Sequence, residues 1–273
     1  MRSEIELWID HHQVSARLVQ RPWLRPVRMA HPVSATLSAH AQGLPDKEQL
    51  LSVCSSLLKP MGKARGIRVI VSDAYARYLV LPRPKGVRSR AELEAAINVR
   101  FHASFGDGGE AGKAWILRTD SAPRAHHDLV CAVRRQVHEA LTQVASTFKT
   151  PLLSVQPLWI WCAAQLEAAR HPLHPDGHWL IVAQGKVITA GLFQAGRCLG
   201  LRSSQQFAAG ESLDNILMRE ASLYAESGEV RQLYIFGKNL MQKRDDSSVE
   251  FASELSVVRA ELPALWDHVG ELG

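Results

Sequence analysis

The stretch RVIVSDAYARYLVLPRPKGVRSRAELEAAINVRFHASFG, residues 68–106, predicts two strands followed closely by a helix. Apolar runs at 67–72 and 75–81 indicate strands, because each is short, rich in β-branched or aromatic residues, and bounded by polar turns. From 89 to 105, apolar residues recur at every fourth position after Ser89, a residue suited to cap a helix. The block therefore has the order strand, turn, strand, loop and helix.

Around this block, the first half of the chain alternates strands with helices. The remaining predicted strands are 4–10, 13–20, 26–30, 114–119, 128–134 and the short run LLSV at 152–155. Helices are predicted at 46–59 and 136–148, and another begins at Pro157 and contains Trp159, Trp161 and Cys162. The spacing of the two tryptophans favours core between two lobes over an exposed partner-binding feature.

The second half repeats the architecture of the first. Strands at 178–184, 186–194 and 197–204 form a predicted meander, followed by a helix at 211–226 and a buried-type strand at 231–237. A weak strand near 249–253 or 256–259 and a helix from Pro263 close the chain. A meander followed by alternating helices and strands, once from residue 4 and again from residue 178, is typical of an actin-like chain with two ribonuclease H-like lobes.

Composition limits the class of protein. With 273 residues and 46% hydrophobic content, the chain is long enough for two lobes with substantial cores. It has no run of about 18 apolar residues and no apolar leader, so we expect a cytosolic location. The four cysteines lie far apart in apolar segments, which favours reduced core thiols. The net charge of +5 permits an acidic partner, an anionic membrane or nucleic acid without choosing among them.

The block at 68–106 also carries a family resemblance. Val71-Ser72-Asp73 is followed by Tyr75, Arg77-Tyr78 and Leu81-Pro82. This order resembles bacterial proteins of the PilM and GspL group, the actin-like cytoplasmic components of type IV pilus and type II secretion assembly platforms. The resemblance implies an α/β, actin-like ATPase fold: two ribonuclease H-like lobes with mixed sheets flanked by helices. We expect the N-terminal lobe at 1–156 and a C-terminal lobe with a truncated end at 157–273.

The first phosphate loop implied by this resemblance departs from the ATP-binding pattern. Asp10 matches its acid, but His11 and His12 replace its small residues. Gln13 follows, and Arg17 is the nearest candidate for the basic position. Glycines in such loops let backbone N–H groups converge on phosphate, which residues with bulky imidazoles do poorly. A tight hairpin is the predicted structure.

The other two nucleotide motifs are also incomplete. The second loop, Ala183-Gln184-Gly185-Lys186, keeps a glycine but lacks the carboxylate that would serve magnesium. On the adenosine side, Gly237 stands alone where the resemblance implies a pair of glycines. Because catalysis needs a complete constellation, we expect no catalytic residues and neither ATP nor magnesium as a cofactor.

The sequence also contains residues that could serve a metal site or a nucleic-acid site. His11-His12 and His126-His127-Asp128 carry metal-ligating groups, but adjacent strand residues face opposite sides and no paired-ligand spacing accompanies them. Surface turns are therefore favoured over a metal site. The basic stretch 83–90 lacks interleaved aromatic residues, which favours a solvated loop over a nucleic-acid site.

The resemblance predicts a non-catalytic cytoplasmic adaptor held at the inner membrane through a partner. That partner is expected to be a PilN-like or GspM-like single-span membrane protein; an assembly ATPase is a second candidate, and a homodimer stays open. An extended partner segment would add to an exposed strand edge or fill the groove between the lobes. The alternative is an actin-like ATP-binding protein or small kinase with an atypical site using Asp10, Asp73 and Lys186.

Overall fold

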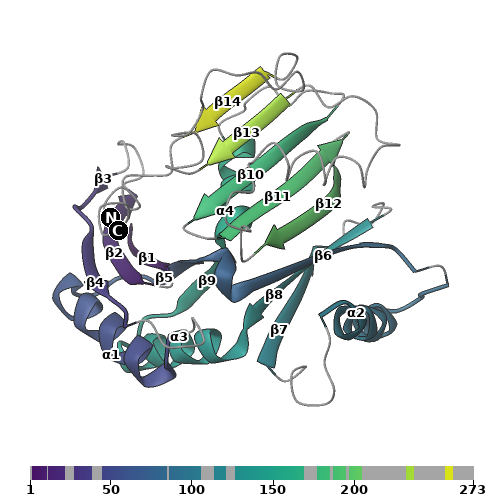
Figure 1. The fold of residues 1–273 in the computed structure, drawn as a ribbon. Coiled ribbons are helices and arrows are strands. Elements are labelled where there is room, and N and C mark those ends of the chain that lie inside the picture. The colour runs from purple at the N-terminus through teal and green to yellow at the C-terminus, as the bar shows by residue number, and fades with distance from the viewer. Residues whose placement is uncertain are drawn as a thin grey trace.

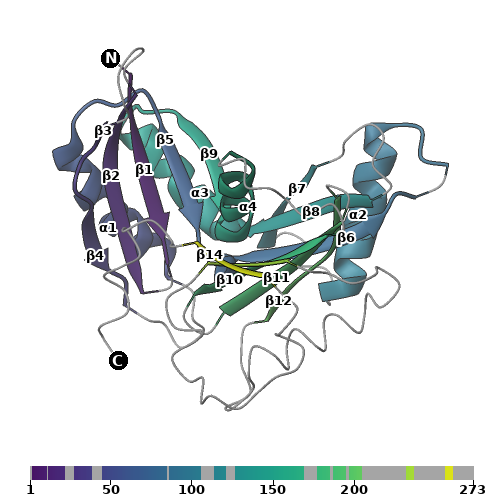
Figure 2. The same cartoon turned by 90° about the horizontal axis from the view of Figure 1, so that it is seen from above.

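The structure is a computed structural model in which three sheets organise the chain (Figure 1, Figure 2). It describes residues 2–10, 12–21, 28–38, 45–84, 86–105, 114–120, 127–168, 177–184, 187–194, 197–204, 232–236 and 256–260. Within these ranges, no helix is long and apolar enough to cross a membrane.

The first sheet has the strand order β3-β2-β1-β5-β9, and β4 also pairs with β2. Its strands are β1 (Arg2–Ile9), β2 (Gln13–Arg21), β3 (Arg28–Met29), β4 (Val33–Thr36), β5 (Ile67–Val71) and β9 (Leu152–Pro157). β1 pairs antiparallel with β2 and parallel with β5, which in turn pairs parallel with β9. Alternation on β1 points Ile5, Leu7 and Ile9 to one face, where they form a core with helices α1 (Lys47–Leu58) and α3 (Arg135–Thr147).

The second sheet is antiparallel, with the order β6-β8-β7. It consists of β6 (Ala76–Pro82), β8 (His127–Arg134) and β7 (Trp115–Asp120), and the 3-10 helix η2 (Asp73–Tyr75) joins it to β5. Helix α2 (Arg90–Phe105) packs on one face through Phe101, which contacts Trp115 and Ala132. Tyr78 and Cys131 lie on the opposite face, toward the third sheet.

The third sheet repeats the topology of the first, with the order β12-β11-β10-β13-β14. Its strands are β10 (His178–Gln184), β11 (Val187–Gln194), β12 (Arg197–Ser204), β13 (Gln232–Phe236) and β14 (Ser256–Ala260). β10 pairs antiparallel with β11 and parallel with β13, as β1 does with β2 and β5. Helix α4 (Leu158–Ala168) lies among the three sheets, so Trp159 and Cys162 share one core with Trp8, Tyr78 and Leu180.

Most predicted elements are confirmed, one strand boundary is corrected, and one strand was missed. In the described part of the strand expected at 26–30, Arg28–Met29 forms β3 and Ala30 lies beyond it. β4 was missed because it is only four residues long and mostly exposed, so it gives no apolar pattern. Of the two positions considered for the last strand, the one near 256–259 is confirmed by β14. The helices predicted at 211–226 and from Pro263, and the strand option at 249–253, lie outside the described residues.

The expectations for the tryptophans and cysteines are also confirmed. Trp159 is 1% exposed, and the Trp161 ring packs edge-on against Trp8 with centroids 4.9 Å apart. All four cysteines are free thiols. Burial raises the pKa of the Cys54 and Cys198 thiols to about 12, so these groups are not nucleophilic thiolates at neutral pH.

Candidate functional site

Asp10 lies at the end of β1, where the chain reverses in a tight hairpin. The Asp10 backbone N–H donates to the Gln13 carbonyl oxygen at 2.8 Å, directly after the last paired residues, Ile9 and Val14. The Tyr75 hydroxyl donates to the Asp10 carbonyl oxygen at 3.1 Å from beneath the bend. The hairpin's backbone is thus used to close the turn and to fix it against η2. His11 lies outside the described residues.

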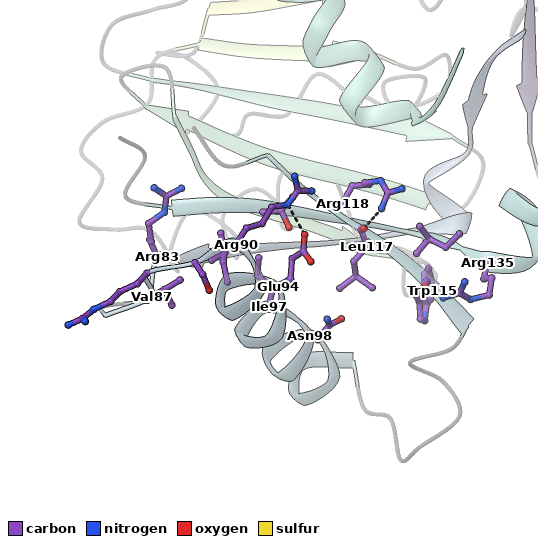
Figure 3. A pocket seen from close by; sticks show the side chains of 15 residues that line it. Arg83, Val87, Arg90, Glu94, Ile97, Asn98, Trp115, Leu117, Arg118 and Arg135 are labelled. Carbon is purple, nitrogen blue, oxygen red and sulfur yellow. Dashed lines mark hydrogen bonds and ion pairs between the residues drawn. The ribbon is translucent and has the colours of Figure 1, made fainter. Parts of the chain in front are cut away.

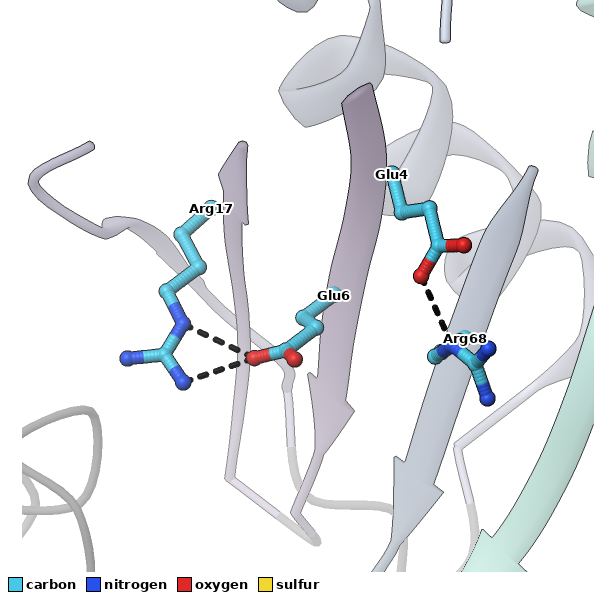
Figure 4. A network of polar contacts seen from close by, with 4 residues as sticks. All are labelled: Glu4, Glu6, Arg17 and Arg68. Carbon is cyan, nitrogen blue, oxygen red and sulfur yellow. Dashed lines mark hydrogen bonds and ion pairs between the residues drawn. The ribbon is translucent and has the colours of Figure 1, made fainter. Parts of the chain in front are cut away.

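Arg17, the candidate basic residue of the first phosphate loop, is held by a carboxylate on the neighbouring strand (Figure 4). It sits directly across from Glu6 in the β1–β2 register, and its Nε and Nη2 donate to Glu6 Oε2 at 2.9 and 2.6 Å. The two side chains are only 11% and 13% exposed, so solvent screens this pair weakly. A charge-assisted contact of this kind occupies the cation that phosphate would need.

A second ion pair continues the same face of the first sheet. Arg68 Nε on β5 donates to Glu4 Oε2 on β1 at 2.8 Å (Figure 4). Glu4 and Glu6 alternate with the core residues of β1, so both carboxylates point away from the core of α1 and α3. The face of the first sheet opposite this core therefore carries two ion pairs.

The second loop offers amide groups and no charge in its described part. Ala183 and Gln184 end β10, opposite Ile188 and Val187 of β11. Gln184 is buried, and among the described residues its carboxamide has no hydrogen-bond partner. Gly185, Lys186 and Gly237 lie outside the described residues, so their contribution to a site stays a prediction.

Asp73, a residue of the enzyme alternative, links β6 of the second sheet to α4 through hydrogen bonds. It is 2% exposed, and its Oδ1 accepts hydrogen bonds from the Tyr78 hydroxyl and, at 3.2 Å, from the Trp159 backbone N–H. The carboxylate therefore caps the N-terminus of α4. Burial raises the pKa of Asp73 to about 6, while the hydrogen bonds from Tyr78 and the α4 backbone oppose that rise. In the structure, the partners of this acid are Tyr78 and the N-terminus of α4.

No cluster of three His, Cys, Asp or Glu side chains in the described ranges is arranged to hold a metal ion. Asp128 is fully buried, and its Oδ1 accepts a hydrogen bond from Arg83 Nη2 at 2.8 Å. The carboxylate of the His126-His127-Asp128 stretch is therefore part of an ion pair. His126 lies outside the described residues.

A groove of about 470 Å³ lies between β9 and the second sheet. We call it the β9 groove; its lining residues are Ile116, Arg118, Thr119, Leu129, Cys131, Val133, His138, Ile160 and all six residues of β9. Burial, with Arg118 and Arg135 nearby, lowers the pKa of His138, so its imidazole is neutral at neutral pH. Arg118 is then the charged group of a mainly apolar groove.

This chain is similar to known proteins in structure rather than in sequence. No protein-family model and no curated protein matches the sequence. Among solved structures, a Bacteroides thetaiotaomicron protein with an actin-like ATPase fold and unknown function is 8% identical, with 95% of this chain and 91% of that chain covered and a TM-score of 0.63. The chain has the actin-like ATPase fold.

Two further structures with this fold match the predicted resemblance. A chain of the PilM–PilN type IV pilus biogenesis complex is 13% identical, covers 97% of this chain and 89% of its own length, and gives a TM-score of 0.65. The cytoplasmic domain of EpsL, an inner-membrane component of the type II secretion system of Vibrio cholerae, is 10% identical, covers 95% and 90%, and gives 0.53. The resemblance to PilM and GspL proteins is confirmed as a resemblance of fold.

Proposed function

We propose that this actin-like chain is a non-catalytic cytoplasmic adaptor of a type IV pilus or type II secretion platform. It lies at the inner membrane and binds the cytoplasmic segment of a PilN-like or GspM-like single-span protein in the β9 groove. The two structures that belong to such systems support this assignment. The main observation that supports the proposal is that the β9 groove runs along a strand edge. We further propose that the lobes divide near residues 156 and 157, where β9 ends and α4 begins.

The β9 groove is suited to an extended peptide. Since successive strand residues face opposite sides, a groove lined by all six residues of β9 runs along the edge of that strand. β9 is the last strand of its sheet, and within the described ranges no strand pairs with its outer edge. A peptide that adds there gains backbone hydrogen bonds, while Leu129, Val133 and Ile160 receive its apolar side chains.

Replacement of Ser154 by arginine is expected to weaken partner binding by about tenfold or more, because a long charged side chain enters the half-buried edge of the groove. The partner is first captured from a detergent extract of native membranes and identified by mass spectrometry. A synthetic copy of its cytoplasmic segment is then titrated by calorimetry. Ser56→Arg is the matched control, because Ser56 is exposed on α1, away from the groove. Equal binding by Ser154→Arg and the wild type would remove the β9 groove from the proposal.

Magnesium-ATP is expected to leave the melting temperature of the protein unchanged. The reason is that Arg17 is paired with Glu6 and the first loop is a closed hairpin, so ligand-linked stabilisation is absent. A thermal-shift scan with and without the nucleotide measures this. A clear upward shift that disappears in Arg17→Ala would reverse the proposal and favour the alternative of an ATP-binding protein or small kinase.

A further inference from the structure

A second groove, of about 1070 Å³, lies between β7 and α2 (Figure 3). Residues 115–119, five in a row on β7, line it, so this groove also runs along a strand edge. β7 ends the order β6-β8-β7, and no other strand in the described ranges pairs with its outer side. An open edge of this length presents backbone N–H and C=O groups that a further strand can use.

The wall opposite β7 comes from α2 and combines two apolar side chains, Leu93 and Ile97, with Arg90, Glu94 and Asn98. Leu93 and Ile97 line the groove from the helix, and Leu117 lines it from the strand. In Figure 3, Glu94 and Ile97 of α2 and Leu117 of β7 lie between the helix and the strands. Every second side chain of an added strand would meet these apolar side chains.

The rim of the groove carries a strong excess of positive charge. Five arginines line it, Arg83, Arg88, Arg90, Arg118 and Arg135, against a single carboxylate, Glu94. Arg83 is held by buried Asp128, and Arg90 Nε pairs with Glu94 at 2.8 Å in an exposed contact. Within the described ranges, Arg88 and Arg118 have no carboxylate in salt-bridge distance; Arg118 Nη1 donates only to the Leu117 carbonyl oxygen, at 3.2 Å.

We infer that this arginine groove binds an extended, acidic segment of a partner protein. The segment adds as a strand to the edge of β7, with one set of side chains on the apolar side chains of α2 and carboxylates against Arg88, Arg90 and Arg118. Charge complementarity selects an acidic occupant, and the strand edge selects an extended one. The inference stands independently of the β9 groove, although Ile116, Arg118 and Thr119 line both.

A nucleic-acid occupant fits the same groove poorly. Trp115 is the one aromatic residue of the lining, and it is 5% exposed with the Arg134 guanidinium 4.1 Å from its ring centroid. Its faces are therefore not open for a base to stack, and single-stranded binding depends on such stacking.

The test uses fluorescein-labelled short peptides of alternating glutamate and valine, with a lysine-valine peptide of the same length for comparison. Anisotropy should show binding of the acidic peptide alone, weakening as salt is added. The double variant Arg88→Glu/Arg90→Glu should lose about tenfold or more in affinity, because both side chains line this groove and neither lines the β9 groove. Arg100→Glu makes the same kind of substitution once, with half the change in charge, at an exposed position of α2 outside the groove, and it should bind like the wild type.

Hydrogen exchange supplies the geometric readout. The acidic peptide should slow amide exchange in residues 115–119, which form the proposed edge. Absence of binding, an equal loss in Arg100→Glu, or protection confined to other elements would overturn the inference. The inference would also be overturned if a single-stranded oligonucleotide or a vesicle of anionic lipid bound more tightly than the peptide and this binding were lost in the double variant. Ser154→Arg should leave binding of the acidic peptide intact. A negative result for the arginine groove can therefore be told apart from a negative result for the β9 groove.

Discussion

Asp73→Ala is expected to lower the free energy of unfolding by about 4 kcal/mol at pH 5. The reason is that the buried Tyr78 hydroxyl and the N–H groups at the start of α4 lose their hydrogen-bond acceptor. Each orphaned buried donor costs about 1–3 kcal/mol. These groups belong to the second sheet and to α4, so the loss is felt where the sheets meet. Chemical denaturation monitored by tryptophan fluorescence measures it.

The size of this loss should depend on pH in a defined direction. The folded pKa of Asp73 is about 6, above its ordinary value of 3.8, so the folded protein holds a proton that the unfolded chain releases between these values. The resulting stabilisation is complete below about pH 4 and is lost as pH rises through about 6. Asp73→Ala should therefore cost less at pH 7.5 than at pH 5.

Two variants make the prediction on Asp73 specific. Asp73→Asn keeps an oxygen acceptor and cannot titrate, so its stability relative to the wild type should change with pH over the same range. Asp46→Ala is the matched control, because Asp46 precedes α1 but makes no capping hydrogen bond with its side chain. It should change stability by less than about 0.5 kcal/mol. A loss at Asp73 no larger than that at Asp46 would contradict the capping role.

Gly191→Ala is expected to cost about 3 kcal/mol, because β11 lies directly against the buried Trp159 ring. A Cβ at Gly191 would lie 2.1 Å from Trp159 Cζ2. The indole cannot retreat, since it stacks on Phe193 with centroids 5.5 Å apart and its Nε1 donates to the Leu180 carbonyl oxygen at 3.0 Å. Overpacking of this kind costs about 1–3 kcal/mol or more. Thermal and urea denaturation measure the change.

A double-mutant cycle tests the cause. Trp159→Phe removes the atoms that meet the new methyl group, so Gly191→Ala should cost about 2 kcal/mol less in that background than in the wild type. Gly66→Ala is the contrasting control: its Cβ would lie 2.4 Å from Leu153 Cγ, but Leu153 is 42% exposed and can turn toward solvent. We expect it to cost about 1 kcal/mol or less. Additive effects at 159 and 191 would mean that the contact is not the source of strain.

Local pattern was enough to predict the architecture. Alternation and apolar runs predict the strands of both meanders, and the four-residue spacing predicts α2. Both patterns arise because burial on one face imposes a period on the sequence. The repeat of a meander followed by alternating helices and strands was visible for the same reason, and together with the resemblance at 68–106 it predicted the actin-like fold. β4 was not predicted, because it is too short and too exposed to show an apolar period in the sequence.

The roles of individual charged residues were decided only by the tertiary structure. Arg17 was the candidate basic residue for phosphate, but the β1–β2 register places Glu6 opposite it. Asp73 belonged only to the enzyme alternative, and in the structure its carboxylate accepts a hydrogen bond from the N-terminus of α4. The basic stretch 83–90 was predicted as a solvated loop, and its described residues 88–90 are exposed; only the structure shows that Arg83, Arg88 and Arg90 also line a groove with β7. Sequence determined which residues alternate and which are buried, because those preferences act over a few neighbouring positions. Partners such as Asp73 and Trp159, 86 positions apart, meet only through the packing of three sheets, and no local period records that meeting.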